Sequence, residues 1–294
     1  MIKKLFYEDG VFFISIPAIL WQILFLVLPI SILFIASFLT YQDGLITKFT
    51  LDQYRAVFKI AHFFVILRSL FLAFLNSCLC LIFAYPVAYY LSMRTSRFKN
   101  LSLFFLTLPF WINFLVHIYS WFFILDNNGV LNNILLNLGL VEQPLHFVNT
   151  VGAIILVMFH GYLPFMILPL YTVLEKLDKR LIEASLDLGA NRTYTFFKIV
   201  LPLSYSGASA GFFLVFVLSF GEFLIPSLLG GGKTLFVGTL ISDYFLVIRS
   251  LPQGAAFTFL SAIMLCLGLL FSHLLLKHFL IQPTLKATAE KKGK

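Results

Sequence analysis

The chain of 294 residues is 60% hydrophobic and only 12% charged, and its formal net charge is +8. Soluble domains are about 25% charged, so these few charges could not cover the surface of a soluble globule of this length. A disordered chain is excluded by the apolar content, and a disulfide scaffold by the presence of only three cysteines. The composition therefore predicts a polytopic membrane protein.

Six stretches are long and apolar enough for transmembrane helices, each of which needs about 20 mostly apolar residues. In chain order they cover about residues 12–39, 69–93, 101–125, 151–174, 203–229 and 255–276. We interpret the first as an uncleaved span, because its uncharged run far exceeds the roughly 7–15 apolar residues of a signal peptide. The predicted fold class is all-α, with six transmembrane helices in a single domain over residues 1–294.

The basic residues indicate the orientation of these spans. If the N-terminus lies inside, the cytoplasmic segments are 1–11, 94–100, 175–202 and 277–294, and they hold 15 of the 21 Lys and Arg residues. Such an excess marks cytoplasmic loops, so both termini are predicted to be cytoplasmic. The same segments hold seven acidic residues, so they carry the whole net charge of +8 and the rest of the chain is neutral. The charge thus reflects topology and a lipid bilayer, and no nucleic-acid partner is expected.

The segment between the fourth and fifth spans, 175–202, is predicted to fold into two helices. Its sequence is EKLDKRLIEASLDLGANRTYTFFKIVLP. Leu177, Leu181, Ala184 and Leu188 recur on one helical face, and Gly189 follows as a stop signal. A second short helix leads to Pro202. A mere connector between two spans would be shorter, so the segment is interpreted as a docking surface.

This segment resembles a known signature. Three parts of the segment resemble the EAA motif of ABC-importer permeases, E-A-A-x3-G-x9-I-x-L-P. They are Glu183-Ala184-Ser185, then Gly189 after three more residues, and Ile199-Val200-Leu201-Pro202 after another nine. Only Ser185 departs from the motif. The resemblance implies that the helix pair fits into a cleft of a separate ATPase subunit and transmits its closure. Asp187, one turn after Glu183, is a further acidic candidate. The predicted coupling residues are Glu183, Ala184, Ser185, Asp187, Gly189, Ile199, Leu201 and Pro202.

The resemblance covers essentially the whole chain. Leu108–Phe147, Leu163–Ser185 and Leu51–Phe58 look like the B-type permease subunit of spermidine/putrescine importers, as does Phe74–Ser77. It implies a type I ABC importer permease of the bacterial cytoplasmic (inner) membrane. It also implies a heterodimer with a second permease subunit, two ATPase subunits and an extracytoplasmic polyamine-binding protein. A related permease for ferric iron, thiamine or another organic cation is the nearest alternative, and a secondary transporter is a more distant one.

No catalytic chemistry is expected of the chain itself. Residues 230–234 end like a Walker A loop, but Ser227 stands where the motif requires glycine and the predicted topology places the segment outside the cell. His117 and His160 lie in spans without any metal-ligand spacing. We therefore expect no enzyme, no cofactor and no metal site, with ATP hydrolysed by a partner chain.

A substrate pathway is predicted from the few polar residues in and beside the spans. Glu222 is the one acidic residue within a span core, and such groups mark a pathway or a buried pair, including a pair with a basic residue of a neighbouring chain. Asn113, His117 and Ser120 form a polar helical stripe. Aromatic side chains beside it would attract ammonium groups or form an interfacial belt. The further candidates are Trp111, Tyr119 and Trp121 of that helix, and Asp126, Asp243 and Tyr244 at the predicted external face.

Small residues open the fifth span. Gly207 and Gly211 stand four residues apart in the run GASAG, a spacing that lets helices approach closely in lipid. The spacing fits contact with a second permease subunit and packing inside this subunit equally well.

Overall fold

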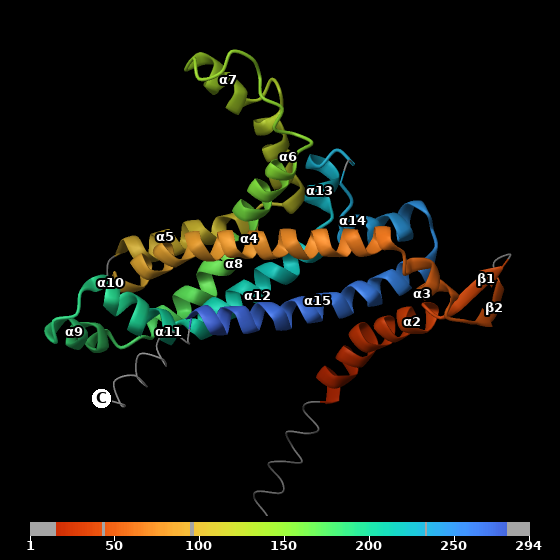
Figure 1. The fold of residues 1–294 in the computed structure, drawn as a ribbon, viewed down its shortest axis with the longest axis horizontal. Coiled ribbons are helices and arrows are strands. Elements are labelled where there is room, and N and C mark those ends of the chain that lie inside the picture. The colour runs from red at the N-terminus through yellow and green to blue at the C-terminus, as the bar shows by residue number, and fades with distance from the viewer. Residues whose placement is uncertain (1–15, 43–44, 95–96, 233, 281–294) are drawn as a thin grey trace, which may run out of the picture. The chain divides into compact units, whose positions relative to one another are not determined.

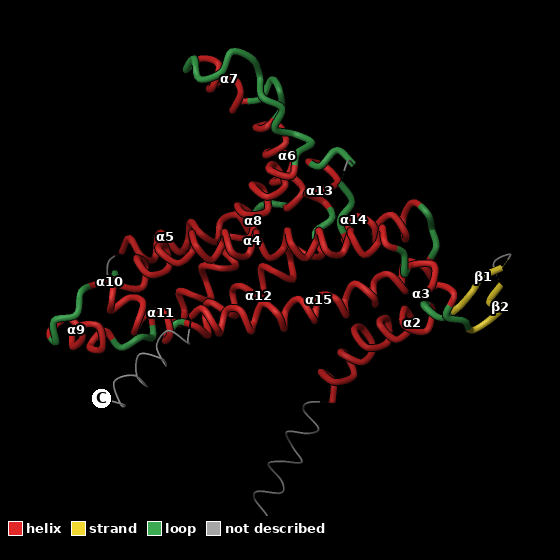
Figure 2. Tube along the Cα trace, viewed as in Figure 1, coloured by secondary structure: helices red, strands yellow, loops and turns green. Residues whose placement is uncertain are grey.

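The computed structural model describes residues 16–42, 45–94, 97–232 and 234–280, and most of them are helical (Figure 1, Figure 2). Two compact units are distinguished among them. The first contains the described residues up to 63 together with 241–262, and the second contains 64–240 together with those from 263 onward. The predicted all-α fold class is confirmed, apart from one short hairpin.

The first unit begins with an apolar helix, Ile16–Ala36, which includes the π-helical turn η1 (Ile23–Val27) and α2 (Leu28–Ala36). Almost every apolar side chain of this helix is exposed, as suits a surface that faces lipid. The antiparallel strands β1 (Leu39–Gln42) and β2 (Leu45–Phe49) follow, paired from Leu39 opposite Phe49 to Gln42 opposite Leu45. The unit also contains α3 (Asp52–Val57) and the π-helical η4 (Asp243–Val247).

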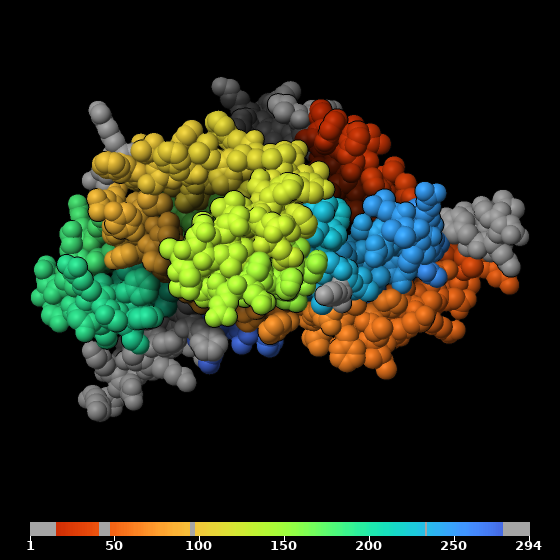
Figure 3. Space-filling view, turned by 90° about the horizontal axis from the view of Figure 1, so that it is seen from above, coloured from red at the N-terminus to blue at the C-terminus, as the bar shows by residue number. Residues whose placement is uncertain are grey.

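The second unit holds the other helices. In chain order they are most of α4 (Ile60–Met93), α5 (Arg97–Thr107), the 3-10 turn η2 (Leu108–Trp111), α6 (Phe114–Leu125), α7 (Val130–Asn137), α8 (Val151–Glu175), α9 (Lys179–Asp187), α10 (Arg192–Thr195), the π-helical η3 (Phe196–Val200), α11 (Leu201–Leu203), α12 (Tyr205–Gly221), α13 (Leu224–Leu229), most of α14 (Val237–Ser242) and the later part of α15 (Leu251–Leu280). The surface of α7 and the loop after it is seen in yellow-green in Figure 3.

The core of the second unit lies where α12 packs along α8 (Figure 1). A Cβ atom at Gly207 would lie 2.9 Å from the carbonyl oxygen of Pro169, and one at Gly211 would lie 2.9 Å from Sδ of Met166. These glycines therefore serve the close approach of α12 to α8 within this chain. Asn76 of α4 adds a buried hydrogen bond of 2.8 Å from its Nδ2 to Oγ of Ser219 on α12.

Among the described residues, four helices are long and apolar enough to cross a membrane, and the number rises to six if each of two bent pairs is one span. The four are Ile16–Ala36, Ile60–Met93, Val151–Glu175 and Leu251–His278. The first predicted span, 12–39, also takes in residues 12–15, which lie outside the described residues. Most of the two predicted cytoplasmic termini, 1–11 and 277–294, also lies outside the described residues.

Two of the predicted spans are not continuous helices. The third, 101–125, breaks between Trp111 and Phe114 with a bend of 94° between its two halves, because Ile112 is extended and Asn113 caps the next helix. The fifth, 203–229, is interrupted at residues 222–223, between α12 and α13, because Glu222 has an extended ψ of 128°. Its beginning is bent as well, by 66° between Leu203 and Tyr205.

Candidate functional site

The segment predicted to dock forms two helices joined by a tight turn, which we call the coupling helix pair (α9, residues 188–191 and α10). Oδ1 of Asp178 accepts a hydrogen bond from the Arg180 N–H at 3.0 Å and so caps the start of α9. Asn191 caps α10 in the same way, accepting from the Tyr194 N–H at 2.7 Å. Short polar side chains placed before each helix thus define both starts.

Gly189 ends α9 in a complete Schellman motif. The Ala190 N–H donates to the Ser185 carbonyl at 3.1 Å, and the Gly189 N–H donates to the Leu186 carbonyl at 2.9 Å. Gly189 has φ +83°, a left-handed conformation that residues with a side chain rarely adopt. The glycine of the signature is therefore required by the backbone of the turn.

Ser185, the one departure from the EAA signature, binds the two helices together. Its side chain is buried, and its Oγ lies 3.0 Å from Oγ1 of Thr195 on α10, within hydrogen-bond distance. Thr195 also donates to the Asn191 carbonyl at 3.1 Å. A serine at this position thus replaces a simple small-residue contact by a hydrogen bond across the turn.

The outer face of the coupling helix pair is open to solvent. Glu183, Ala184 and Asp187 are exposed, and Leu188 is 89% exposed. Leu181, on the same predicted apolar face, is 48% exposed, so within the described part of the chain nothing covers this face. The other predicted coupling residues, Ile199, Leu201 and Pro202, are half-buried and lead through η3 and α11 into α12.

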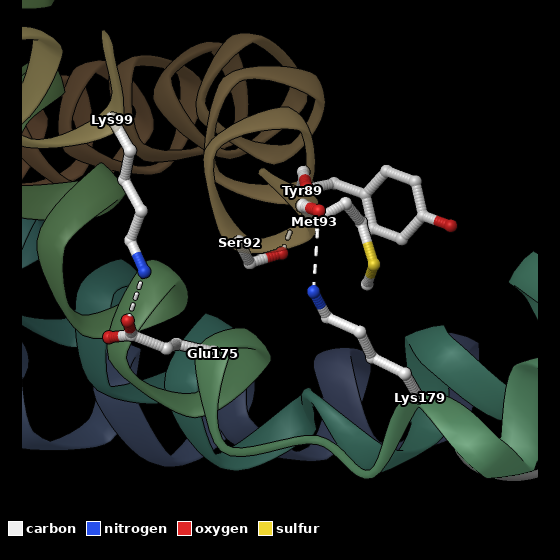
Figure 4. Close-up of polar contacts among 6 residues, drawn as sticks. All are labelled: Tyr89, Ser92, Met93, Lys99, Glu175 and Lys179. Carbon is white, nitrogen blue, oxygen red and sulfur yellow. Dashed lines mark hydrogen bonds and ion pairs between the residues drawn. The ribbon is translucent and has the colours of Figure 1, made fainter. Parts of the chain in front are cut away.

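Two polar contacts join helix ends at and beside the coupling helix pair (Figure 4). Nζ of Lys179, the first residue of α9, donates to the Met93 carbonyl at the end of α4 at 3.3 Å. Lys99 forms an ion pair with Glu175, which links the start of α5 to the end of α8. Both partners lie in segments predicted to be cytoplasmic, and the hydrogen bond from Lys99 lowers the pKa of the Glu175 carboxyl below its ordinary value.

Glu222 lies at the break after α12 and is almost fully buried, with 8% of its surface exposed. Its Oε1 accepts hydrogen bonds from the backbone N–H groups of Leu224 at 2.9 Å and Ile225 at 3.2 Å. Its Oε2 accepts one from the hydroxyl of Tyr162 on α8. The carboxylate therefore both caps α13 and ties it to α8.

A cavity of about 370 Å³ opens beside this carboxylate, and we call it the Glu222 cavity. It is lined by Pro109, Phe110, Ile112, Phe114, His117, Gly161, Tyr162, Phe165, Leu218 and Glu222. Nε2 of His117 is buried and has no hydrogen-bond partner among the described residues. The break of the third predicted span at residues 112–113 supplies part of the wall.

The lining contains two of the ten predicted pathway residues, Glu222 and His117. Among those outside it, Asn113 caps α6 through a 2.9 Å bond from the Leu115 N–H, and Ser120 donates to the Val116 carbonyl of its own helix. Trp111 and Tyr119 are exposed, and Trp121 packs edge-on against His160, which in turn stacks on His117. The polar stripe predicted on α6 therefore contributes one side chain to the cavity.

The candidates at the predicted external face lie elsewhere. Asp126 is half-buried after α6, where its carbonyl accepts from Nδ2 of Asn132 at 3.1 Å. Asp243 and Tyr244 belong to the first unit, in which the buried Tyr244 hydroxyl lies 3.0 Å from Nε2 of His62.

Sequence reasoning missed the phenylalanine and tyrosine side chains of the Glu222 cavity, which are Phe110, Phe114, Tyr162 and Phe165. All four lie in apolar runs where aromatic residues are frequent, and no spacing connects Tyr162 with a residue 60 positions away. Among the residues that the structure describes, no three His, Cys, Asp or Glu side chains gather closely enough to hold a metal ion.

Comparison with known proteins gives one family. The family described as "Binding-protein-dependent transport system inner membrane component" matches residues 81–280. The spermidine/putrescine transport system permease protein PotB of Escherichia coli (strain K12) is 40% identical over 252 residues, which cover 85% of this chain and 92% of that protein. PotB of Haemophilus influenzae is 39% identical over 80% of this chain and 83% of its own length. The inner membrane ABC transporter permease protein YdcU of Escherichia coli is 32% identical over 92% of this chain and 87% of its own length.

Solved structures share the fold. A chain of a bacterial ABC transporter involved in the import of the acidic polysaccharide alginate superposes with a TM-score of 0.69 at 19% identity, covering 94% of this chain and 98% of that one. A chain of the bacterial alginate ABC transporter in complex with an alginate pentasaccharide-bound periplasmic protein superposes with a TM-score of 0.71 at 17% identity. The match covers 96% of this chain and 97% of that one.

Proposed function

The chain belongs to the family of binding-protein-dependent transport system inner membrane components, and on that basis we propose that it is a permease subunit of a bacterial ABC importer that moves polyamines such as spermidine and putrescine. The observation that carries this proposal is the 40% identity to PotB over 85% of the chain. Residues 1–294 would form one permease domain, and both α4 and α15 contribute residues to the two compact units.

The energy for uphill transport would come from two separate ATPase subunits that bind the coupling helix pair. The support is its open face, where Ala184 and Leu188 have no cover in the described part of the chain and Glu183 and Asp187 add negative charge. A large, well-packed partner surface would bury these apolar groups. A second permease subunit and an extracytoplasmic polyamine-binding protein would complete the importer.

The predicted orientation, with both termini in the cytoplasm of a cell with an inner membrane, places the coupling helix pair inside. Two contacts support the grouping of segments by side on which this orientation is built, because each joins segments that were assigned to one side. Lys99 and Glu175 both belong to predicted cytoplasmic segments. On the opposite side, the Asn149 N–H donates to the Leu229 carbonyl at 2.8 Å, at the ends of two predicted spans.

The mechanism follows from the continuity of the helices beyond the turn. Closure of the ATPase pair would displace α9 and α10, and η3 and α11 would carry the movement into α12, which packs tightly on α8. Packed helices move as rigid bodies because interiors are dense and hard to compress. The far end of α12 is the break at Glu222, so a displacement of the coupling helix pair would reach the Glu222 cavity. The permease pair would then open outward to receive substrate from the binding protein.

Reconstitution tests the proposal. The chain, its sister permease, the ATPase subunits and the binding protein encoded beside it are incorporated into proteoliposomes, and uptake of radiolabelled putrescine, spermidine, thiamine and ferric iron is measured with and without ATP. We expect ATP-dependent uptake of the polyamines alone. Uptake of thiamine or iron without polyamine would identify a related importer for another solute, and uptake without the ATPase would indicate a secondary transporter; each result would contradict the proposal.

A further inference from the structure

We propose that the Glu222 cavity binds one primary ammonium group of an alkylamine, with Glu222 and His117 as its acceptors and aromatic rings around it. The choice of alkylamine among cations rests on the proposed function, whereas the site itself rests on the chemistry of the cavity. Glu222, His117 and Tyr162 come from three different elements, the end of α12, α6 and α8, and all line the same space.

The charge of the cavity lining favours a cation. Glu222 is almost fully buried, and within the described ranges no lysine or arginine lies within ion-pair distance of it. Its hydrogen bonds from Tyr162 and from two backbone N–H groups occupy three of about four acceptor positions of a carboxylate. These donors are neutral, so within the described ranges no basic side chain compensates the carboxylate beside the cavity. A buried charge without a partner is costly, so a cation that enters the cavity is stabilised there.

Among the described residues, the ring of His117 also carries an unpaired nitrogen. Nε2 of His117 is buried and has no partner among the described residues, although its side chain lines the cavity. Buried polar atoms are almost always hydrogen-bonded, and an exception calls for an explanation. In the tautomer that carries its proton on Nδ1, this nitrogen accepts a hydrogen bond. An ammonium group has three donors, so one that bonds to Glu222 has two left for acceptors such as this nitrogen.

Aromatic and apolar side chains form much of the remaining cavity wall. Phe110, Phe165 and the ring of Tyr162 line the cavity, and their faces attract cations. Pro109 and Leu218 offer apolar contacts that fit methylene groups. A sugar would need many more hydrogen-bond partners, and an anion would be repelled by Glu222. A cation with a short apolar chain matches both the acceptors and the wall, and about 370 Å³ lies at the small end of ligand pockets.

Gly161 provides a test that leaves all of these groups in place. It lines the cavity, and a Cβ atom added to it meets nothing within 4 Å. Gly161→Leu therefore fills the cavity, and it favours the helix because leucine is a better helix former than glycine. Gly152→Leu, on the same helix but outside the cavity, is the matched control, since a Cβ atom there meets only Oγ1 of Thr150 at 3.8 Å.

Both variants and Glu222→Gln are assayed in the complete complex. Putrescine uptake into proteoliposomes gives kcat/KM, and the melting temperature of the detergent-solubilised complex without binding protein is measured with putrescine or with uncharged 1,4-butanediol. We expect Glu222→Gln and Gly161→Leu each to lower kcat/KM at least about tenfold, as for the loss of a charged hydrogen bond. Putrescine, but not butanediol, should stabilise the wild type and Gly152→Leu, and neither compound should stabilise Gly161→Leu.

Wild-type uptake by Gly161→Leu would overturn the site, because the cavity would then be outside the path. Normal uptake by Glu222→Gln would overturn the role of the carboxylate. A loss of uptake in Gly152→Leu equal to that in Gly161→Leu would also refute it, because the effect would not come from the cavity. If the wild-type complex failed to transport any polyamine, the proposed function would be wrong, whereas stabilisation by putrescine would still report on the cavity.

Discussion

Substitution of Gly189 tests whether the turn of the coupling helix pair has to keep its shape. Gly189 has φ +83°, and a Cβ atom added there meets nothing within 4 Å. The cost of a side chain is therefore a backbone cost alone. Left-handed backbone costs residues with a Cβ about 1–2 kcal/mol, asparagine tolerates it best, and a β-branched residue is a genuine outlier.

A cost of about 1.4 kcal/mol shifts the balance between the formed and the distorted turn tenfold. We therefore expect ATP-driven uptake and co-purification of the ATPase to fall in the order glycine, asparagine, alanine, valine. Gly189→Asp adds a negative charge to the same strain. The assays are uptake into proteoliposomes and the amount of ATPase that co-purifies with the permease from membranes, each normalised to the permease inserted.

Gly139 provides a matched control. It ends α7 in the same Schellman pattern, with the Leu140 N–H bonded to Leu135 and the Gly139 N–H bonded to Leu136, both at 3.0 Å. Its φ is +66°, and a Cβ atom there also meets nothing within 4 Å. Gly139→Val should thus strain the backbone equally while ATPase binding stays at the wild-type level. Wild-type coupling in Gly189→Val, or equal loss of ATPase in both variants, would refute the reasoning.

Three further predictions concern packing and charge. Ser185→Ala should lower the free energy of unfolding by about 1 kcal/mol, because the hydrogen bond to Thr195 is lost, and should keep coupling. Ser185→Leu should abolish ATPase co-purification because the site is buried. Retention of the ATPase by Ser185→Leu would contradict this prediction. Gly211→Val should lower the free energy of unfolding, measured in detergent, by about 1–3 kcal/mol. The control variant Ala210→Val should not lower it, because Ala210 is exposed. Equal losses in the two variants would mean that α12 does not pack closely on α8 there. The pKa of Glu175 is lowered in the folded state, so the small stabilisation from its ion pair with Lys99 is present above the ordinary pKa of 4.5 and is lost as the pH falls through the folded value. The measurement is the difference in thermal stability between wild type and Glu175→Gln. A difference that persists in strong acid would contradict the ion pair.

Much of the fold could be predicted because its signals are local. Long apolar runs identify spans such as Val151–Glu175, and Gly189 marks the end of α9. The β-hairpin was not predicted, although the sequence Asp43-Gly44 is common in hairpin turns. These two residues themselves lie outside the described part of the chain. The breaks at residues 112–113 and 222–223 escaped prediction because hydropathy stays high across them. Hydropathy measures transfer into lipid, whereas a helix break depends on which partners replace the lost backbone hydrogen bonds.

The candidate sites divide in the same way. The coupling helix pair is continuous in sequence, so its caps, its turn and its exposed face could all be read from residues a few positions apart. The Glu222 cavity joins three elements, and the sequence could single out Glu222 and His117 by their polarity but not bring them together. Tyr162, whose hydroxyl bonds to Glu222, had no signal of its own. Tertiary packing, which no local pattern encodes, decides which polar groups meet.

The most direct measurement of the central claim is a site-specific cross-link from the tip of the coupling helix pair. A photo-crosslinking amino acid is placed at Leu188, which is 89% exposed after α9, or at Leu138, which is 66% exposed at the matching position after α7. In the assembled complex, we expect Leu188 to cross-link to the ATPase subunit and Leu138 not to. A complex that transports polyamine but gives no ATPase cross-link from Leu188, or an equal one from Leu138, would contradict the account.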